Sequence, residues 1–144
     1  MEIRVQRLDR RLPLPKQQHT EDAGYDLHAR ETVELAAGGG RALVPTGLAV
    51  AIPSGYAGFV LPRSGLALKS GVTCLNTPGL IDPLYRGELK VLLVNTDPSR
   101  PYTVQRGDRI AQLVIQRVEQ VDWHEVEQLD ATERDTFGFG STGV

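Results

Sequence analysis

The residues best suited to chemistry begin with Pro62-Arg63-Ser64-Gly65, which sets a guanidinium, a hydroxyl and a small residue side by side. The guanidinium of Arg63 could clamp a phosphate through two parallel hydrogen bonds. If a short helix begins here, its free N–H groups and the positive end of its dipole would favour the same ligand. A plain structural turn also explains the segment when it is taken alone.

A second candidate lies between Gly79 and Gly87, where an acid, an aromatic residue and an arginine share one tight turn before an apolar strand. Pro83 keeps the preceding Asp82 out of the helical region and favours an extended or turn geometry. A charged β-turn would account for the acid and the glycines. It gives no reason for Tyr85, so the turn is a candidate site.

Two polar residues interrupt otherwise apolar strands. Asp26 lies within Ala23-Gly24-Tyr25-Asp26-Leu27, and Gln112 lies within the run from Ile110 to Ile115. Buried polar groups need hydrogen-bond partners, so both residues are candidate site residues. The alternatives are a charge on an edge strand for Asp26 and a solvent-facing position in the pleat for Gln112.

Other motifs indicate no function. Gly138 to Gly143 matches G-x-G-x-x-G, but the printed chain ends one residue later, without the helix and second strand of a dinucleotide site. Arg106-Gly107-Asp108 is expected to be a hairpin turn between two strands. A single cysteine excludes the cysteine pair of a zinc deaminase. The histidines share no metal-ligand spacing; they are His19, His28 and His124.

Composition indicates one soluble globular domain. The chain has 144 residues, 40% of them apolar, and a net charge of −2, so nothing suggests a nucleic-acid or membrane surface. An anionic ligand would therefore need a local cluster of cations. Cys74 has no partner for a disulfide and is expected to be a buried, inert thiol. With no apolar signal segment at the N-terminus, these features predict a reducing, cytoplasmic location.

Short β-branched or alternating runs between many glycines and prolines predict an all-β sandwich or barrel. The expected strands are 2–8, 32–35, 42–52, 58–61, 72–75, 88–95, 102–104, 109–118 and 123–126. A short helix is expected over Ser64–Lys69 with Ser64 as its N-cap. The strands around 91–94 and 110–115 are apolar on both faces, which indicates either a central position or a subunit interface. Residues 134–144 are Gly-rich and polar and are expected to form a disordered tail.

Five ordered segments together resemble the motifs of the trimeric dUTPase family. They are Ala23-Gly24-Tyr25-Asp26-Leu27, Pro62-Arg63-Ser64-Gly65-Leu66-Ala67, Gly79-Leu80-Ile81-Asp82 with Tyr85-Arg86-Gly87-Glu88, Arg106 to Leu113, and Arg134 with Gly138 to Gly143. The resemblance implies a jelly-roll-like β-barrel over residues 1–133 with a flexible C-terminal arm over 134–144. It also implies a homotrimer whose active sites are shared between chains.

The activity implied by the resemblance is hydrolysis of dUTP to dUMP and pyrophosphate, with Mg²⁺ bound to the triphosphate. In that scheme Asp82 deprotonates the water that attacks the α-phosphorus. Tyr85 packs on the deoxyribose and leaves no room for a 2′-hydroxyl, and Asn76 reads the uracil edge. A rigid hairpin backbone would exclude the methyl group of thymine by steric clash.

The resemblance assigns the phosphates to a second group of residues. Arg63, Ser64 and Gly65 would contact the phosphates, and Gln112 would join them from a neighbouring subunit. Asp26 would lie near the magnesium ion and touch it through water. The arm would close over the site of another chain with Arg134, Phe139, Gly140, Ser141 and Thr142.

The arm departs from the usual family pattern, because Asp135 and Phe137 stand where glycines are common. This difference concerns the closed position of the arm and leaves the chemistry at Asp82 unchanged. One alternative is a dCTP deaminase of the same superfold, which would need an additional catalytic glutamate where Pro83 follows Asp82. Another alternative is a non-catalytic trimer that binds dUTP or a protein partner.

Overall fold

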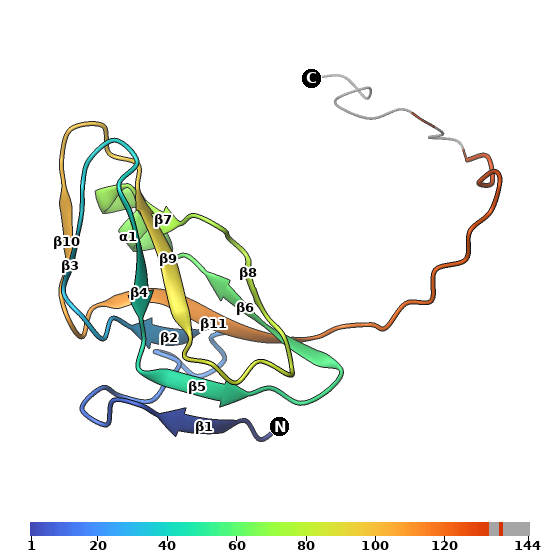
Figure 1. Cartoon of the computed structure of the whole chain (residues 1–144), viewed down its shortest axis with the longest axis horizontal. Coiled ribbons are helices and arrows are strands. Elements are labelled where there is room, and N and C mark those ends of the chain that lie inside the picture. Colours follow the sequence, from blue (N-terminus) through green and yellow to red (C-terminus); the bar gives the residue numbers. More distant parts are fainter. Residues whose placement is uncertain (133–135, 137–144) are drawn as a thin grey trace.

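The computed structural model describes residues 1–132 and residue 136, and within them strands predominate (Figure 1). Their order along the chain is β1 (Arg4–Arg7), β2 (Tyr25–His28), β3 (Val33–Leu35), β4 (Arg41–Pro45), β5 (Leu48–Ala51), β6 (Tyr56–Leu61), α1 (Ser64–Ser70), β7 (Val72–Cys74), β8 (Gly79–Ile81), β9 (Lys90–Asn95), β10 (Tyr102–Val104) and β11 (Arg109–Arg117). Every strand pairing in this part of the chain is antiparallel.

The largest sheet has the strand order β2-β11-β6-β8, and a second sheet has the order β4-β9-β7. Two further pairs, β1 with β5 and β3 with β10, complete the strand framework (Figure 1). The core lies between these sheets, and its fully enclosed side chains include Leu27, Leu35, Val44, Leu93 and Val104. Burying a side chain of this size stabilises the fold by roughly 1.5–3 kcal/mol.

The two strands that are apolar on both faces occupy central positions. β9 lies between β4 and β7, and β11 lies between β2 and β6. Neighbours on both sides explain why neither strand shows a simple alternation of apolar and polar residues. The choice of a central position is thereby confirmed for both strands, and a subunit interface stays a prediction.

Asn95, at the end of β9, is a polar group inside this core. Its side-chain amide donates to the carbonyls of Leu35 at 3.2 Å and Arg100 at 2.8 Å, and its oxygen accepts from the N–H of Asp97 at 3.0 Å. A fully buried amide is tolerated because its hydrogen bonds are satisfied. These bonds tie β3, β9 and the loop before β10 together.

Most predicted strands are confirmed, and two predictions are wrong. The run 42–52 forms two strands, because Gly47 has a φ of 72° and breaks the extended chain between β4 and β5. Residues 123–126 form no strand. Every residue from 119 to 132 is exposed, and this segment runs away from the sheets in Figure 1. An extended segment without a neighbouring strand cannot pair its backbone groups.

The predicted helix is present, but its N-cap is Arg63, not Ser64. Arg63 has an extended backbone (φ −95°, ψ 122°), whereas Ser64 is already helical. Gly71 closes the helix in the left-handed conformation, which a glycine adopts without steric cost. In the described residues, no helix is long and apolar enough to cross a membrane.

Two smaller predictions are settled by the same elements. Residues Arg106 and Gly107 do form a turn, but it links β10 to β11, which belong to different sheets, so it is not a hairpin turn. Cys74 is buried, and burial raises the pKa of its thiol to about 11, as expected of an inert cysteine.

Candidate functional site

A polar pocket gathers the predicted phosphate residues on one face of the large sheet. The cavity has a volume of about 500 Å³. Its lining includes the predicted site residues Asp26, Arg63, Ser64, Gly65 and Gln112. We call this cavity the arginine pocket, because Arg63 and Arg109 both line it.

The register of the large sheet explains why these residues meet. On β11, Gln112 lies opposite Asp26 of β2 on one side and opposite Leu61 of β6 on the other. Since β6 ends at Leu61, the chain runs from there directly into Arg63 and the first turn of α1. Three segments far apart in the sequence therefore converge on Gln112.

Asp26 holds two arginines at this junction. Its carboxylate is 3.6 Å from the Nε of Arg63 and 3.1 Å from a terminal nitrogen of Arg109, and it also accepts a hydrogen bond from Gln18 at 2.7 Å. Arg63 in turn donates to the backbone carbonyl of Arg109 at 3.0 Å. Asp26 is buried, and its partners meet the requirement that a buried charge be paired.

Gln112 reaches the pocket within its own chain. Its amide donates to the carbonyl of Pro62 at 3.0 Å, next to Arg63. The prediction that Gln112 joins Arg63 and Ser64 from a neighbouring subunit is therefore wrong. The register of β11 against β6 already brings these residues together in one chain.

Gly24 leaves the space that the Gln112 side chain fills. A Cβ at Gly24 would lie 2.2 Å from the side-chain oxygen of Gln112 and 3.0 Å from its Cδ. The φ of Gly24 is not positive, so a larger residue would conflict with the Gln112 side chain and not with the backbone conformation. The Ala-Gly-Tyr-Asp segment thus supplies a charge at Asp26 and room at Gly24.

The turn with Asp82 and Tyr85 lies apart from the arginine pocket. Asp82 is exposed and lines a different cavity of about 810 Å³, which shares no lining residue with the arginine pocket. The N–H of Tyr85 donates to the carbonyl of Asp82 at 3.1 Å. Arg86 braces the same turn by donating to the carbonyls of Pro83 at 2.6 Å and Tyr85 at 2.7 Å.

Asn76 lies in the loop between β7 and β8 and is exposed. Its side-chain amide packs against Gly79, where an added Cβ would lie 3.3 Å from the nitrogen. Asn76 therefore lies on the segment that links β7 to β8, and β8 leads into Asp82. The expected hairpin is wrong here, because β7 pairs with β9 and β8 pairs with β6, in different sheets. One chain thus carries two groups of predicted site residues, one in the arginine pocket and one on the β7–β8 loop and the turn that follows β8.

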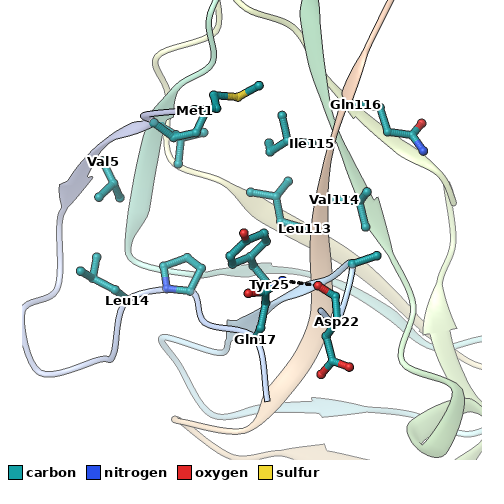
Figure 2. A pocket seen from close by; sticks show the side chains of 14 residues that line it. Met1, Val5, Leu14, Gln17, Asp22, Tyr25, Leu113, Val114, Ile115 and Gln116 are labelled. Carbon is teal, nitrogen blue, oxygen red and sulfur yellow. Dashed lines mark hydrogen bonds between the residues drawn. The ribbon is translucent and has the colours of Figure 1, made fainter. Parts of the chain in front are cut away.

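A third, more apolar cavity of about 720 Å³ lies beside β1 and β11. Figure 2 shows the ring of Tyr25 and the side chains of Val5, Leu14, Leu113 and Ile115 around it. Among the described residues, no predicted site residue lines this cavity. Its apolar lining is suited to packing against another surface more than to phosphate chemistry.

Several residues that line the arginine pocket were not predicted from the sequence. Arg109 was not proposed, because its position beside Asp26 depends on the register of β11 against β2. The lone acid in an apolar strand was the available signal, since such an acid requires a cation. Gln18 and Gly24 gave no recognisable signal of their own.

The charged residues around Asp26 also affect the pKa of His28, the last residue of β2. Burial lowers the pKa of His28, and the nearby carboxylate of Asp26 acts against that shift. Arg109 and Arg63 add to the lowering, because like charges disfavour the protonated imidazole. The net lowering of the pKa favours the neutral form of His28.

In the part of the chain that the structure describes, no group of three or more His, Cys, Asp or Glu side chains could hold a metal ion. The predicted arm residues lie outside the described residues; they are Arg134, Phe139, Gly140, Ser141 and Thr142.

The fold and the two groups of polar residues define an all-β protein of the jelly-roll-like β-clip type, with an arginine-lined pocket at the end of its main sheet. The model of the dUTPase family matches residues 10–143. The chain belongs to the dUTPase family.

Relatives and solved structures agree with this assignment. The deoxyuridine 5′-triphosphate nucleotidohydrolase of Corynebacterium glutamicum is 57% identical, over 98% of this chain and 94% of the relative. That of Thermobifida fusca is 55% identical, over 98% of this chain and 78% of the relative. The Staphylococcus bacteriophage 80alpha dUTPase with dUPNHPP matches with a TM-score of 0.87 and 31% identity, covering 99% of each chain.

A dUTPase from phage phi11 of S. aureus, described with a structural Mg(II) ion, matches with a TM-score of 0.79 and 28% identity. The match covers 89% of this chain and 98% of that chain. These likenesses confirm the predicted family and the predicted jelly-roll-like fold.

Proposed function

We propose that this chain hydrolyses dUTP to dUMP and pyrophosphate, with Asp82 as the general base. The observation that carries the proposal is the pairing of an arginine-lined pocket with a separate turn that presents an acid and an aromatic ring. Relatives at 57% and 55% identity that carry the name of this activity support it. The reaction would limit uracil incorporation into DNA and supply dUMP for dTMP synthesis.

Asp82 is suited to activate the attacking water. It is an exposed carboxylate on a turn whose backbone is braced by Arg86 and by the Tyr85 N–H. The carboxylate would take a proton from the water as the water oxygen attacks the α-phosphorus and pyrophosphate leaves. General base catalysis of this kind contributes ~10²–10⁴ in rate.

The arginine pocket is suited to hold the phosphates. Arg63 is oriented by Asp26 and by the carbonyl of Arg109, which leaves its remaining N–H groups for a phosphate oxygen. The amides of Ser64 and Gly65 belong to the first turn of α1, whose N–H groups have no partner within the helix. Gln112 supplies a further polar group beside them.

Mg²⁺ fits this pocket as an ion carried by the triphosphate. It prefers oxygen ligands and keeps several waters, and the Asp26 carboxylate has oxygen lone pairs beyond those used by its arginine partners. Asp26 would hold the ion through water. The ion would supply positive charge where the phosphates carry negative charge.

We further propose that the active protein is a homotrimer. The pocket of Arg63 and the pocket of Asp82 share no lining residue, which favours a site that combines surfaces of different chains. The third contribution would be the arm, with Arg134 and Ser141 on the γ-phosphate and Phe139 on the base. The apolar cavity of Figure 2 offers one surface that a neighbouring chain could cover.

Selection of the nucleotide is assigned to the β7–β8 loop and the turn that follows β8. Asn76 would read the uracil edge, and the Tyr85 ring would exclude a ribose 2′-hydroxyl. A buried mismatch of hydrogen-bonding groups is costly, which would exclude cytosine.

A pyrophosphate-release assay with dUTP, dTTP, dCTP and UTP tests the proposal. We expect turnover of dUTP alone, and we expect Asp82→Asn to lose at least about 10²-fold in kcat with dUTP binding retained. Turnover of dCTP with release of ammonia would indicate the deaminase instead. Binding of dUTP without turnover by the unmodified chain would indicate a non-catalytic trimer.

A further inference from the structure

The Tyr85 side chain is held in place by two backbone features of its own turn. Its hydroxyl donates to the carbonyl of Glu88 at 3.1 Å, which fixes the outer end of the ring. A Cβ built at Gly87 would lie 2.4 Å from that hydroxyl, 2.6 Å from Cζ and 3.0 Å from Cε2. The hydroxyl end of the ring therefore occupies the space that any other residue at position 87 would fill.

The backbone conformation at Gly87 does not require glycine. Its φ is not positive, so an alanine could adopt the same conformation. The ring of Tyr85 is what excludes a side chain at this position. This separates Gly87 from turn glycines such as Gly107, whose φ of 91° would itself strain an L-residue.

The carbonyl that receives the hydroxyl belongs to a rigid part of the fold. The Glu88 carboxylate accepts from the N–H of Gly47 at 2.8 Å and pairs with Arg30 at 3.3 Å. The next residue, Leu89, is buried, and its N–H donates to Leu48 at 2.7 Å. The position of the ring is therefore set by the β4–β5 turn through Glu88.

We propose that Gly87 is a specificity-determining residue: its missing side chain lets the Tyr85 ring lie against the backbone with its hydroxyl on Glu88. This proposal rests on the proposed function, in which the exposed side of the ring faces the sugar. The distance between the ring and the sugar decides whether a 2′-hydroxyl fits. Gly87 sets that distance, because it lets the opposite side of the ring lie against the backbone.

Gly87→Ala tests the idea directly. An ordinary contact of 3.4 Å would require the ring carbon now at 2.6 Å to move by about 0.8 Å. A ring pushed toward the sugar would impair dUTP, and a ring that swings away would admit UTP. A ring that swings away lowers the ratio of kcat/KM for dUTP to kcat/KM for UTP, whereas a ring pushed toward the sugar raises it, because the 2′-hydroxyl is then excluded more strongly. In either case we expect the ratio to change by roughly tenfold.

The matched control is Gly87→Ala in a Tyr85→Ala background, measured by pyrophosphate release with both nucleotides. Without the ring there is nothing for the new methyl group to displace, so we expect the ratio to change by less than about twofold in that background. General destabilisation would act equally on both nucleotides, so it would leave the ratio of the single variant unchanged. Circular dichroism and thermal unfolding establish that each variant is folded.

A second variant keeps the proposal testable if Gly87→Ala does not fold. Tyr85→Phe removes the hydrogen bond to Glu88 and adds no atom, and we expect a smaller change in the same ratio. An unchanged ratio in the folded Gly87→Ala variant, or in Tyr85→Phe where that variant is needed, would overturn the role of Gly87. A wild-type chain that does not hydrolyse dUTP would instead overturn the proposed function itself.

Discussion

Gly24→Ala should uncouple activity from stability, because the three atoms nearest to a Cβ built at Gly24 all belong to Gln112, a proposed phosphate-binding residue. The new Cβ would lie 2.2 Å from the side-chain oxygen of Gln112, and an ordinary contact begins at 3.4 Å. The amide must therefore withdraw by about 1.2 Å, and the hydrogen bond from Gln112 to the Pro62 carbonyl is lost.

The cost in stability is small. The lost hydrogen bond is worth about 1 kcal/mol net. The restriction of the unfolded chain by alanine offsets this by about 0.5 kcal/mol. The remaining difference would lower the melting temperature of a chain of this size by only about 2 °C.

The cost in activity is larger, because a misplacement near 1 Å in a phosphate-binding group can reduce the rate by up to about 10²-fold. We expect kcat/KM for dUTP to fall by about 10–100-fold, equivalent to about 1.4–2.7 kcal/mol of transition-state stabilisation. Initial rates with dUTP and Mg²⁺, together with thermal unfolding of the same samples, measure both quantities.

Gln112→Ala is the matched control, since it removes the amide without changing Gly24. We expect the two variants to fall to a similar kcat/KM. A Gly24→Ala enzyme within about twofold of wild type would refute the reasoning, because the amide would then be dispensable or free to move. A large fall in melting temperature would mean that the methyl group disturbs more than Gln112.

Two further predictions concern assembly and acid stability. The first assumes that Asp82 and Arg63 of one site come from different chains. A 1:1 mixture of Asp82→Asn and Arg63→Ala chains should then recover about a quarter of the wild-type activity after subunit exchange, because each residue is intact in half of the chains. No recovery in a mixed trimer would contradict shared sites. Asp9 is hydrogen-bonded by Arg106, which lowers its pKa from 3.8 to about 2, so its contribution to stability is present above pH 3.8 and is lost as pH falls through 2. Asp9→Asn should therefore lower the urea midpoint at pH 7 and converge with wild type toward pH 2, whereas a constant difference would contradict the role of Asp9.

Local patterns in the sequence located most elements of this fold. The run 102–104 was predicted with the bounds that β10 has, because short β-branched segments between turn residues have few alternatives. The break at Gly47 was missed, since a glycine within an apolar run does not by itself reveal a positive φ. The strand expected at 123–126 failed because its apolar residues have no neighbouring strand within the chain.

The candidate site was predictable only where a residue acts through its own chemistry. Arg63, Ser64 and Gln112 were identified from the sequence, and the structure brings them to one pocket. Arg109 was missed, because it acts through Asp26 on a strand far away in the sequence. Its position follows from the register of β11 against β2, which a single sequence does not contain.

Gly24 and Gly87 illustrate a further limit of sequence reasoning. Neither glycine has a positive φ, so no local backbone requirement identifies it. Each instead leaves space for the side chain of a proposed site residue, Gln112 in one case and Tyr85 in the other. Such a role appears only when the side chains are in place, because the sequence shows the glycine but not what lies against it.

The charges in the arginine pocket indicate why further cations are needed. Its charged lining residues are two acids, Asp22 and Asp26, and two arginines, Arg63 and Arg109, so their formal charges balance. A triphosphate carries about four negative charges and cannot be neutralised by a balanced pocket. Asp26 orients the two arginines, but its negative charge also cancels part of their positive charge. On the proposed function, the magnesium ion on the nucleotide and Arg134 would supply the remaining positive charge.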